Sequence, residues 1–116
     1  MHEVIVDSLP ILGKTLTSVK KSGDEILFIT SDGEQWKMSH DQGCCERVLI
    51  EDLVGDLQDL IGSPIVVAEV TTKDKESYGI GMWTFYTIAT VRGTVTIRWL
   101  GESNGHYGVS VSFTKL

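Results

Sequence analysis

The sequence predicts an α+β fold: a twisted, mostly antiparallel sheet of about six or seven strands with one amphipathic helix packed on it. Two observations lead to this prediction. Apolar and polar residues alternate with a period of two in several runs on both sides of the chain's middle, whereas one stretch between them has a helical period. A chain of 116 residues builds one core, so residues 1–116 are expected to form a single domain.

The N-terminal third predicts an antiparallel meander. A short apolar run at residues 4–6, ended by Pro10, is typical of an edge strand. Three alternating runs follow at residues 14–19, 25–30 and 34–39. They are separated by turns at residues 22–24 and 31–33, where glycines permit tight reversals. Trp36 and Met38 should share one face of the third run.

The middle of the chain predicts the helix, over residues 52–61. Its apolar positions recur at three- and four-residue intervals: Ile50, Leu53, Val54, Leu57, Leu60 and Ile61. Acids near residue 51 suit a helix start, Gly62 suits a left-handed cap, and Pro64 stops continuation. Residues 44–50, just before this segment, fit either an extended or an irregular structure.

The second half predicts four strands. Residues 65–71 favour a central strand, residues 73–81 a loop, and residues 107–113 a final strand. The clearest hairpin joins residues 82–91 to 94–100. A two-residue turn at Arg92-Gly93 would place Thr87 opposite Arg98 and Phe85 opposite Leu100.

One face of this hairpin is a candidate ligand surface. Trp83 and Phe85 could stack a base while Arg98 binds a phosphate or carboxylate. The adjoining turn supplies further polar groups, namely Glu102, Ser103, Asn104 and His106. The alternative is that the first meander simply covers these aromatic residues.

Charge points to a second candidate surface. The net charge is −6, and residues 40–62 hold six acids against the single base Arg47. On the predicted helix, Asp52, Asp56 and Asp59 would share one face and could dock a basic host protein, although exposed acids are often only solvated. Scattered bases in an acidic chain argue against direct binding of a nucleic-acid backbone.

Metal and thiol chemistry are weaker alternatives. His40, Cys44, Cys45 and His106 are the atom types that zinc prefers, but adjacent cysteines rarely bind one ion together, so no metal or other cofactor is expected. No catalytic motif accompanies a Cys–His nucleophile here, so a binding protein is the preferred interpretation. An enzyme centred on these residues is the alternative. Free thiols and the lack of an apolar leader favour the cytoplasm and argue against a membrane protein; a homo-oligomer is compatible with the composition.

Two blocks of the sequence resemble a known family. The blocks HDQGCCERVLIEDLVGDLQDLIGSPI and WTFYTIATVRGTVTIRWLGESNGHYGVSVSF resemble a family of small phage and prophage proteins of unknown function. The resemblance implies a phage-encoded protein acting in the cytoplasm of a bacterial host. We therefore expect a non-catalytic counter-defence or host-takeover protein that sequesters a small nucleotide-type signal or blocks a host protein.

Overall fold

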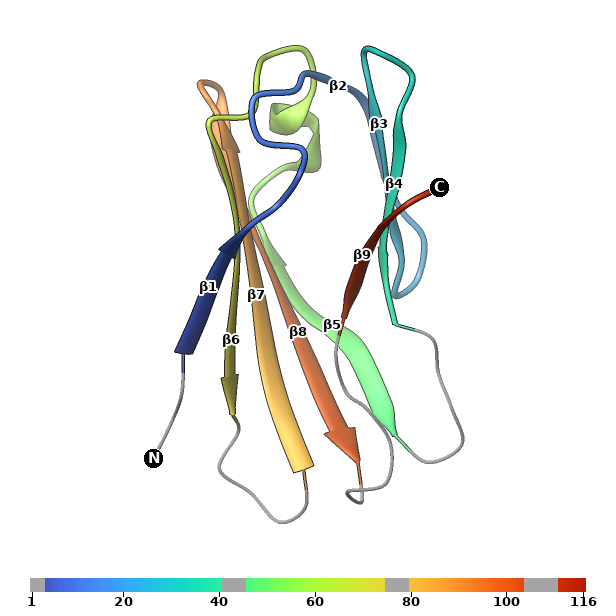
Figure 1. Cartoon of the computed structure of the whole chain (residues 1–116), viewed down its shortest axis with the longest axis vertical. Coiled ribbons are helices and arrows are strands. Elements are labelled where there is room, and N and C mark those ends of the chain that lie inside the picture. The colour runs from blue at the N-terminus through green and yellow to red at the C-terminus, as the bar shows by residue number, and fades with distance from the viewer. Residues whose placement is uncertain (1–3, 41–45, 75–79, 104–110) are drawn as a thin grey trace.

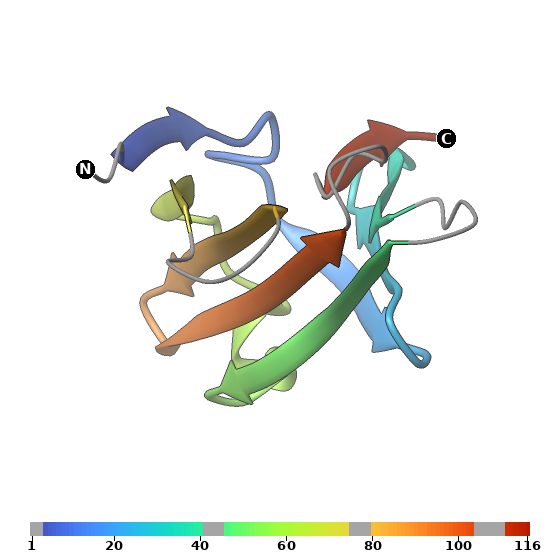
Figure 2. The ribbon, with the colours of Figure 1, turned by 90° about the horizontal axis from the view of Figure 1, so that it is seen from below.

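The structure is a computed structural model that describes residues 4–40, 46–74, 80–103 and 111–116. Within these ranges, nine strands form two antiparallel sheets that face each other (Figures 1 and 2). The predicted α+β class is wrong, because the only helix in the described ranges is one 3₁₀ turn. The protein is a β-sandwich.

The larger sheet has five strands in the order β1-β6-β7-β8-β5. Their bounds are β1 Val4–Ser8, β5 Arg47–Val54, β6 Val67–Asp74, β7 Ile80–Thr90 and β8 Gly93–Ser103. The predicted N-terminal edge strand is confirmed as β1, and the predicted central strand is confirmed as β6, which lies between β1 and β7.

The smaller sheet has four strands in the order β2-β3-β4-β9. Their bounds are β2 Leu16–Lys21, β3 Ile26–Thr30, β4 Gln35–Ser39 and β9 Ser112–Lys115. The predicted meander is thus confirmed as β2, β3 and β4. The predicted final strand corresponds to β9, although residues 107–110 lie outside the described ranges.

The core fills the space between the two sheets. On β3, the alternate residues Ile26, Phe28 and Thr30 point into it. Trp99 of β8 is buried, and its indole N–H donates to the sulfur of Met38 on β4 at 3.3 Å. This contact joins the sheets and gives a buried donor its partner.

The predicted helix is instead a bulged strand followed by a 3₁₀ turn, η1 (Leu57–Leu60). A bulge between Ile50 and Asp52 adds one residue to β5, so Ile50 and Leu53 both face the core although they are three positions apart. Leu57 and Leu60 then repeat the three-residue interval in η1. Two short elements together therefore imitate one helical period.

Gly55 separates these two elements. Its φ is +105°, and a Cβ built on it would lie 2.4 Å from the backbone oxygen of Thr94. Only glycine fits this position, because a side chain would be both strained and blocked. A single glycine inside an apparent helix was the available signal against the helix.

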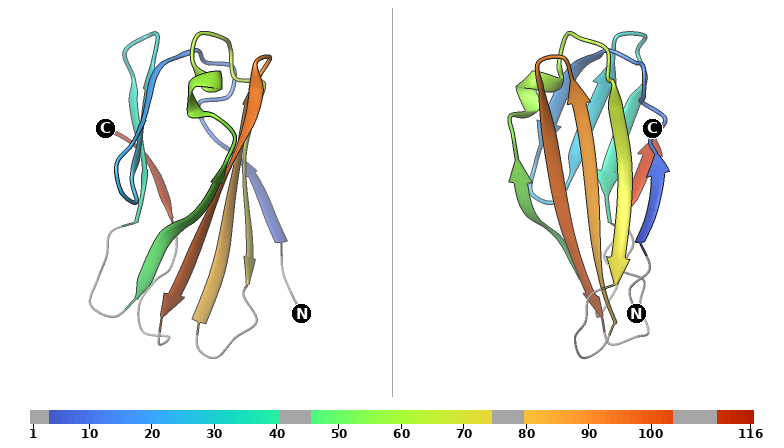
Figure 3. Two further views of the ribbon diagram at one scale, coloured as in Figure 1. Left: turned by 180° about the vertical axis from the view of Figure 1, so that it is seen from behind. Right: turned by 90° about the vertical axis from the view of Figure 1, so that its left-hand side faces the viewer.

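η1 lies between the sheets at one end of the sandwich (Figure 3). Its buried Leu60 contributes to the core, and the element contacts β2, β7 and β8. Thr90, at the end of β7, donates its hydroxyl to the Asp59 carbonyl and so ties η1 to the β7–β8 hairpin. η1 therefore closes this end of the core.

The β7–β8 hairpin is confirmed, but its register differs from the prediction by two residues. Thr90 pairs with Gly93, so the turn is Val91-Arg92, and Phe85 lies opposite Arg98. Gly93 is not a turn glycine; a Cβ there would lie 2.8 Å from the Asp59 carboxylate. It is the first residue of β8 and lies against the Asp59 side chain of η1. A shift of two residues leaves every side chain on its predicted face.

Candidate functional site

The predicted ligand residues lie on the outer side of the five-stranded sheet. Trp83 and Phe85 alternate along β7 with the buried Thr84 and Tyr86, and both are half-buried outside the hydrophobic core. The first meander packs on the opposite side of this sheet. The alternative that it covers these aromatic residues is therefore wrong.

Three strands contribute to this surface through their registers. Leu100 of β8 lies opposite Trp83 and also opposite Leu49 of β5, so three large apolar residues form one row across the sheet. Phe85 stacks beside Trp83 with 6.4 Å between ring centroids. We call this surface the aromatic face and define it as Leu49, Trp83, Phe85, Arg98 and Leu100.

Arg98 is held on the aromatic face by carboxylates of β5. Its Nη2 donates to Glu51 Oε1 at 2.9 Å, and its Nε lies 2.6 Å from Glu51 Oε2 as an ion contact. Asp52 approaches Nη2 at 3.8 Å. The hydrogen bond with Glu51, aided by both negative charges, raises the pKa of Arg98 above its usual value, against a smaller opposing effect of desolvation.

The same guanidinium lies over an aromatic ring. Its central carbon is 5.3 Å from the Trp83 ring centroid, within the range of a cation–π contact. Glu51 reaches it because Glu51 occupies the β5 bulge. Two carboxylates therefore lie beside the positive charge of Arg98, and its guanidinium packs over the Trp83 ring.

The three predicted partner-binding acids do not form a helix face, because no α-helix is present there. Asp52 lies on β5 beside Arg98, whereas Asp56 caps η1 by accepting from the Gln58 N–H at 2.9 Å. Asp59 lies against Gly93 in the β7–β8 hairpin. Only Asp52 adjoins the aromatic face, and the predicted helix face shared by the three acids is wrong.

Of the metal and thiol candidates, only His40 is described. Its Nε2 lies 2.9 Å from Glu46 Oε2, and these side chains are only 8% and 3% exposed. Cys44, Cys45 and His106 lie outside the described residues. Among those that are described, no three His, Cys, Asp or Glu side chains are close enough to hold a metal ion.

The turn residues predicted to line the ligand surface are only partly described. Glu102 and Ser103 end β8 and are half-buried, while Asn104 lies outside the described ranges. Glu102 lies opposite Arg47, and Ser39 of β4 lies opposite Ser112 of β9. The strand ends that flank residues 40–46 and 104–111 are thus neighbours at the lower end of Figure 1.

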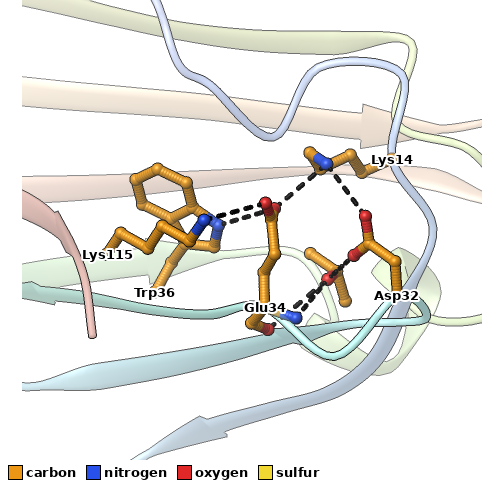
Figure 4. A network of polar contacts seen from close by, with 6 residues as sticks. Lys14, Asp32, Glu34, Trp36 and Lys115 are labelled. Atoms are coloured by element: carbon orange, nitrogen blue, oxygen red, sulfur yellow. Dashed lines mark hydrogen bonds and ion pairs between the residues drawn. The ribbon is translucent and has the colours of Figure 1, made fainter.

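A polar network that the sequence did not predict joins three segments at the end of the four-stranded sheet that holds the β3–β4 turn (Figure 4). Lys14 Nζ contacts Asp32 at 3.2 Å and Glu34 at 3.0 Å, while Lys115 contacts Glu34 at 3.2 Å. Trp36 donates its indole N–H to Glu34, and the Thr30 hydroxyl donates to Asp32.

These contacts shift ionisation in the directions expected of paired charges. The hydrogen bond with Glu34, then that with Asp32, raises the pKa of Lys14; Lys14, followed by Trp36 and Lys115, lowers the pKa of Glu34. Thr30, followed by Lys14, lowers the pKa of Asp32. Two ammonium groups balance two carboxylates, so the network fastens the fold and leaves no net charge for a ligand.

The structure also contains a hollow that sequence reasoning missed. It has a volume of about 400 Å³ and lies on the outer side of the four-stranded sheet, away from the aromatic face. Its lining residues are Lys20, Ser22, Glu25, Leu27, Lys37 and Leu116. The available signal was the alternation in β3, which places Leu27 on the side opposite Ile26 and Phe28.

Comparison with known proteins gives a family but no function. A family model described as a domain of unknown function, DUF7448, matches residues 9–113. No curated protein and no solved structure matches the chain. In the described ranges, every helix is too short or too polar to span a bilayer.

Proposed function

Because the chain belongs to the DUF7448 family, whose function is unknown, we propose its function from the aromatic face: it is a non-catalytic protein that docks on a partner protein and blocks it. The observation that supports this proposal is the row formed by Leu49, Leu100 and Trp83, with Phe85 beside it, on the outer side of a sheet. Large apolar side chains gathered on an outer surface are typical of a recognition site.

The composition of the face favours a protein as its target. Aromatic residues and arginine are the types enriched at the centres of protein interfaces. A regular antiparallel sheet presents these side chains as a broad surface, which suits another protein surface. Trp83 and Phe85 would be the anchors, since rigid aromatic side chains lose little conformational entropy on binding.

Charge suggests the chemistry of the partner. The chain carries a net charge of −6, and Glu51 and Asp52 add two carboxylates around one guanidinium. This excess of negative charge favours a partner with basic groups around an apolar patch, and it disfavours a phosphate at Arg98. From the resemblance to phage proteins, the partner would be a protein of the bacterial host.

Capture from a bacterial lysate, followed by reconstitution with the purified partner, tests the proposal. Wild-type bait is compared with Trp83→Ala and with the matched control Ile29→Ala, which removes a half-buried apolar side chain from the outer side of the other sheet. Trp83→Ala should weaken the reconstituted complex about 30-fold, as loss of an interface anchor does. The control should bind as wild type does.

Two results would contradict this proposal. Equal affinities of wild type and Trp83→Ala would show that the aromatic face does not carry binding. The second is a saturable change in tryptophan fluorescence on titration with signalling nucleotides, abolished in Arg98→Ala without a lower melting temperature. It would favour sequestration of a nucleotide, the other form of the expected function.

A further inference from the structure

We propose that the hollow on the four-stranded sheet binds a small amphipathic anion, a carboxylate or phosphate that carries a short apolar body. This site is separate from the aromatic face and does not depend on it. It lies on the outer side of the other sheet. The two sheets face each other through their inner sides (Figure 2).

The floor of the hollow is apolar because of its register. Leu27 of β3 lies opposite Lys20 of β2 and opposite Lys37 of β4, so one leucine sits between two lysines in a row across three strands. Directly opposite side chains in antiparallel strands have Cβ atoms about 5 Å apart, so the methylene stems of both lysines flank Leu27. Leu116 adds a further apolar side chain to the lining.

The charged side chains of the hollow differ in balance from those of the whole molecule. Among the lining side chains, Lys20 and Lys37 provide two ammonium groups against the one carboxylate of Glu25, whereas the chain as a whole is acidic. No carboxylate of the described residues lies within ion-pair distance of Lys20. The local excess of positive charge selects for an anion.

Lys37 is paired, but weakly. Its Nζ lies 3.4 Å from Glu25 Oε1, and the two side chains are 35% and 48% exposed. Exposed pairs of this kind contribute little stability, so Lys37 can turn toward an anion at small cost. An anionic group held between the two lysines would leave its apolar body on Leu27 and Leu116.

The volume of the hollow limits the size of the ligand that it can bind. A volume of about 400 Å³ is at the small end of the range of ligand sites in proteins. It accommodates an acyl or alkyl chain of several carbons with its head group. The probes are therefore octanoate and octyl phosphate, which differ only in the anionic head.

The test is titration with both probes, followed by methyl NMR of the leucines. Saturable shifts of Leu27 and Leu116 are expected with at least one probe, and affinity should fall as salt rises, because the lysines are solvent-accessible. Octanol, which lacks the charge, and acetate, which lacks the apolar body, should bind at least about tenfold more weakly. If octanoate and octyl phosphate both leave these methyl signals unchanged, or octanol binds as well as they do, the proposal is wrong.

Substitutions assign the two ammonium groups. Lys20→Gln with Lys37→Gln should weaken the better probe about tenfold or more, whereas Lys20→Arg should retain binding. The matched control is Lys73→Gln, an exposed lysine on β6 in the other sheet. If the control and the double variant lose equal affinity for the probe, overall charge explains the effect and the proposed site is wrong. Melting temperatures of all variants confirm that each remains folded.

Discussion

Replacing Gly55 by alanine distinguishes the observed fold from the helix that the sequence pattern suggests. In the interior of a helix, glycine to alanine would raise the free energy of unfolding by about 1 kcal/mol. In the sandwich the sign is reversed. Gly55 has φ +105°, and holding alanine in such a conformation costs about 1–3 kcal/mol.

Steric overlap adds to this strain. The new Cβ would lie 2.4 Å from the Thr94 oxygen and 3.1 Å from the Val95 Cα, both in the backbone of β8. Overpacking of this kind costs about 1–3 kcal/mol more, since the hairpin must shift. We therefore expect a total loss of about 2–6 kcal/mol. A loss of about 3 kcal/mol lowers the urea midpoint by about 1–3 M for a small domain.

The assay is equilibrium unfolding in urea, with Gly62→Ala as the matched control. Gly62 also has positive φ, +89°, but no atom lies within 4 Å of the position that a Cβ would take there, so only the strain remains. Gly55→Ala should therefore be less stable than Gly62→Ala. The reasoning is refuted if Gly55→Ala is as stable as wild type, or if the two variants lose equal amounts.

Three further substitutions test other contacts. Leu60→Ala empties a fully buried position in η1 and should lower the free energy of unfolding by about 2–5 kcal/mol in urea. Glu34→Gln removes a carboxylate whose pKa is lowered below its ordinary 4.5. The variant should therefore melt at a lower temperature than wild type at neutral pH, and this difference should disappear as the pH falls through the lowered pKa of Glu34. Asp24→Ala removes the carboxylate that accepts the Ile50 N–H of edge strand β5 at 2.9 Å; stability should fall by about 1 kcal/mol, and light scattering should show more self-association.

Each of these has a matched control. Leu12→Ala truncates a leucine that is 49% exposed and should cost far less than Leu60→Ala. Glu69→Gln removes one negative charge from the outer side of β6 without an observed ion pair among the described residues. It should show neither the pH dependence of Glu34→Gln nor the association of Asp24→Ala. If it does, net charge and not the specific contact explains the effect.

Period-two alternation was a sufficient guide to most strands and to the faces of their side chains. Alternation placed Trp83, Phe85 and Arg98 together on one side of the β7–β8 hairpin, and the structure has them there. This held even though the register was wrong by two residues, because an even shift preserves faces. The local pattern of one strand pair therefore contained most of the candidate site.

Contacts between residues distant in the sequence determine the features that the local sequence pattern could not predict. The bulge at Glu51 exists because β5 pairs with β8, and nothing near Glu51 in the sequence announces its contact with Arg98. Gly93 resembled a turn residue, although it begins β8 and lies against Asp59 of η1. The network around Glu34 likewise joins residues far apart in the chain, from Lys14 to Lys115.

The strand order also sets the sequence of events during synthesis of the chain. β2, β3 and β4 are joined by short turns and can pair as soon as they leave the ribosome, whereas β4 receives its second neighbour, β9, only when residues 112–115 have been synthesised. β1 waits in the same way for β6. Distant pairings are slow to form, so the nascent chain carries unpaired strand edges until β6 and then β9 have been synthesised. Truncation near residue 111 would leave β4 as an open edge in the finished protein.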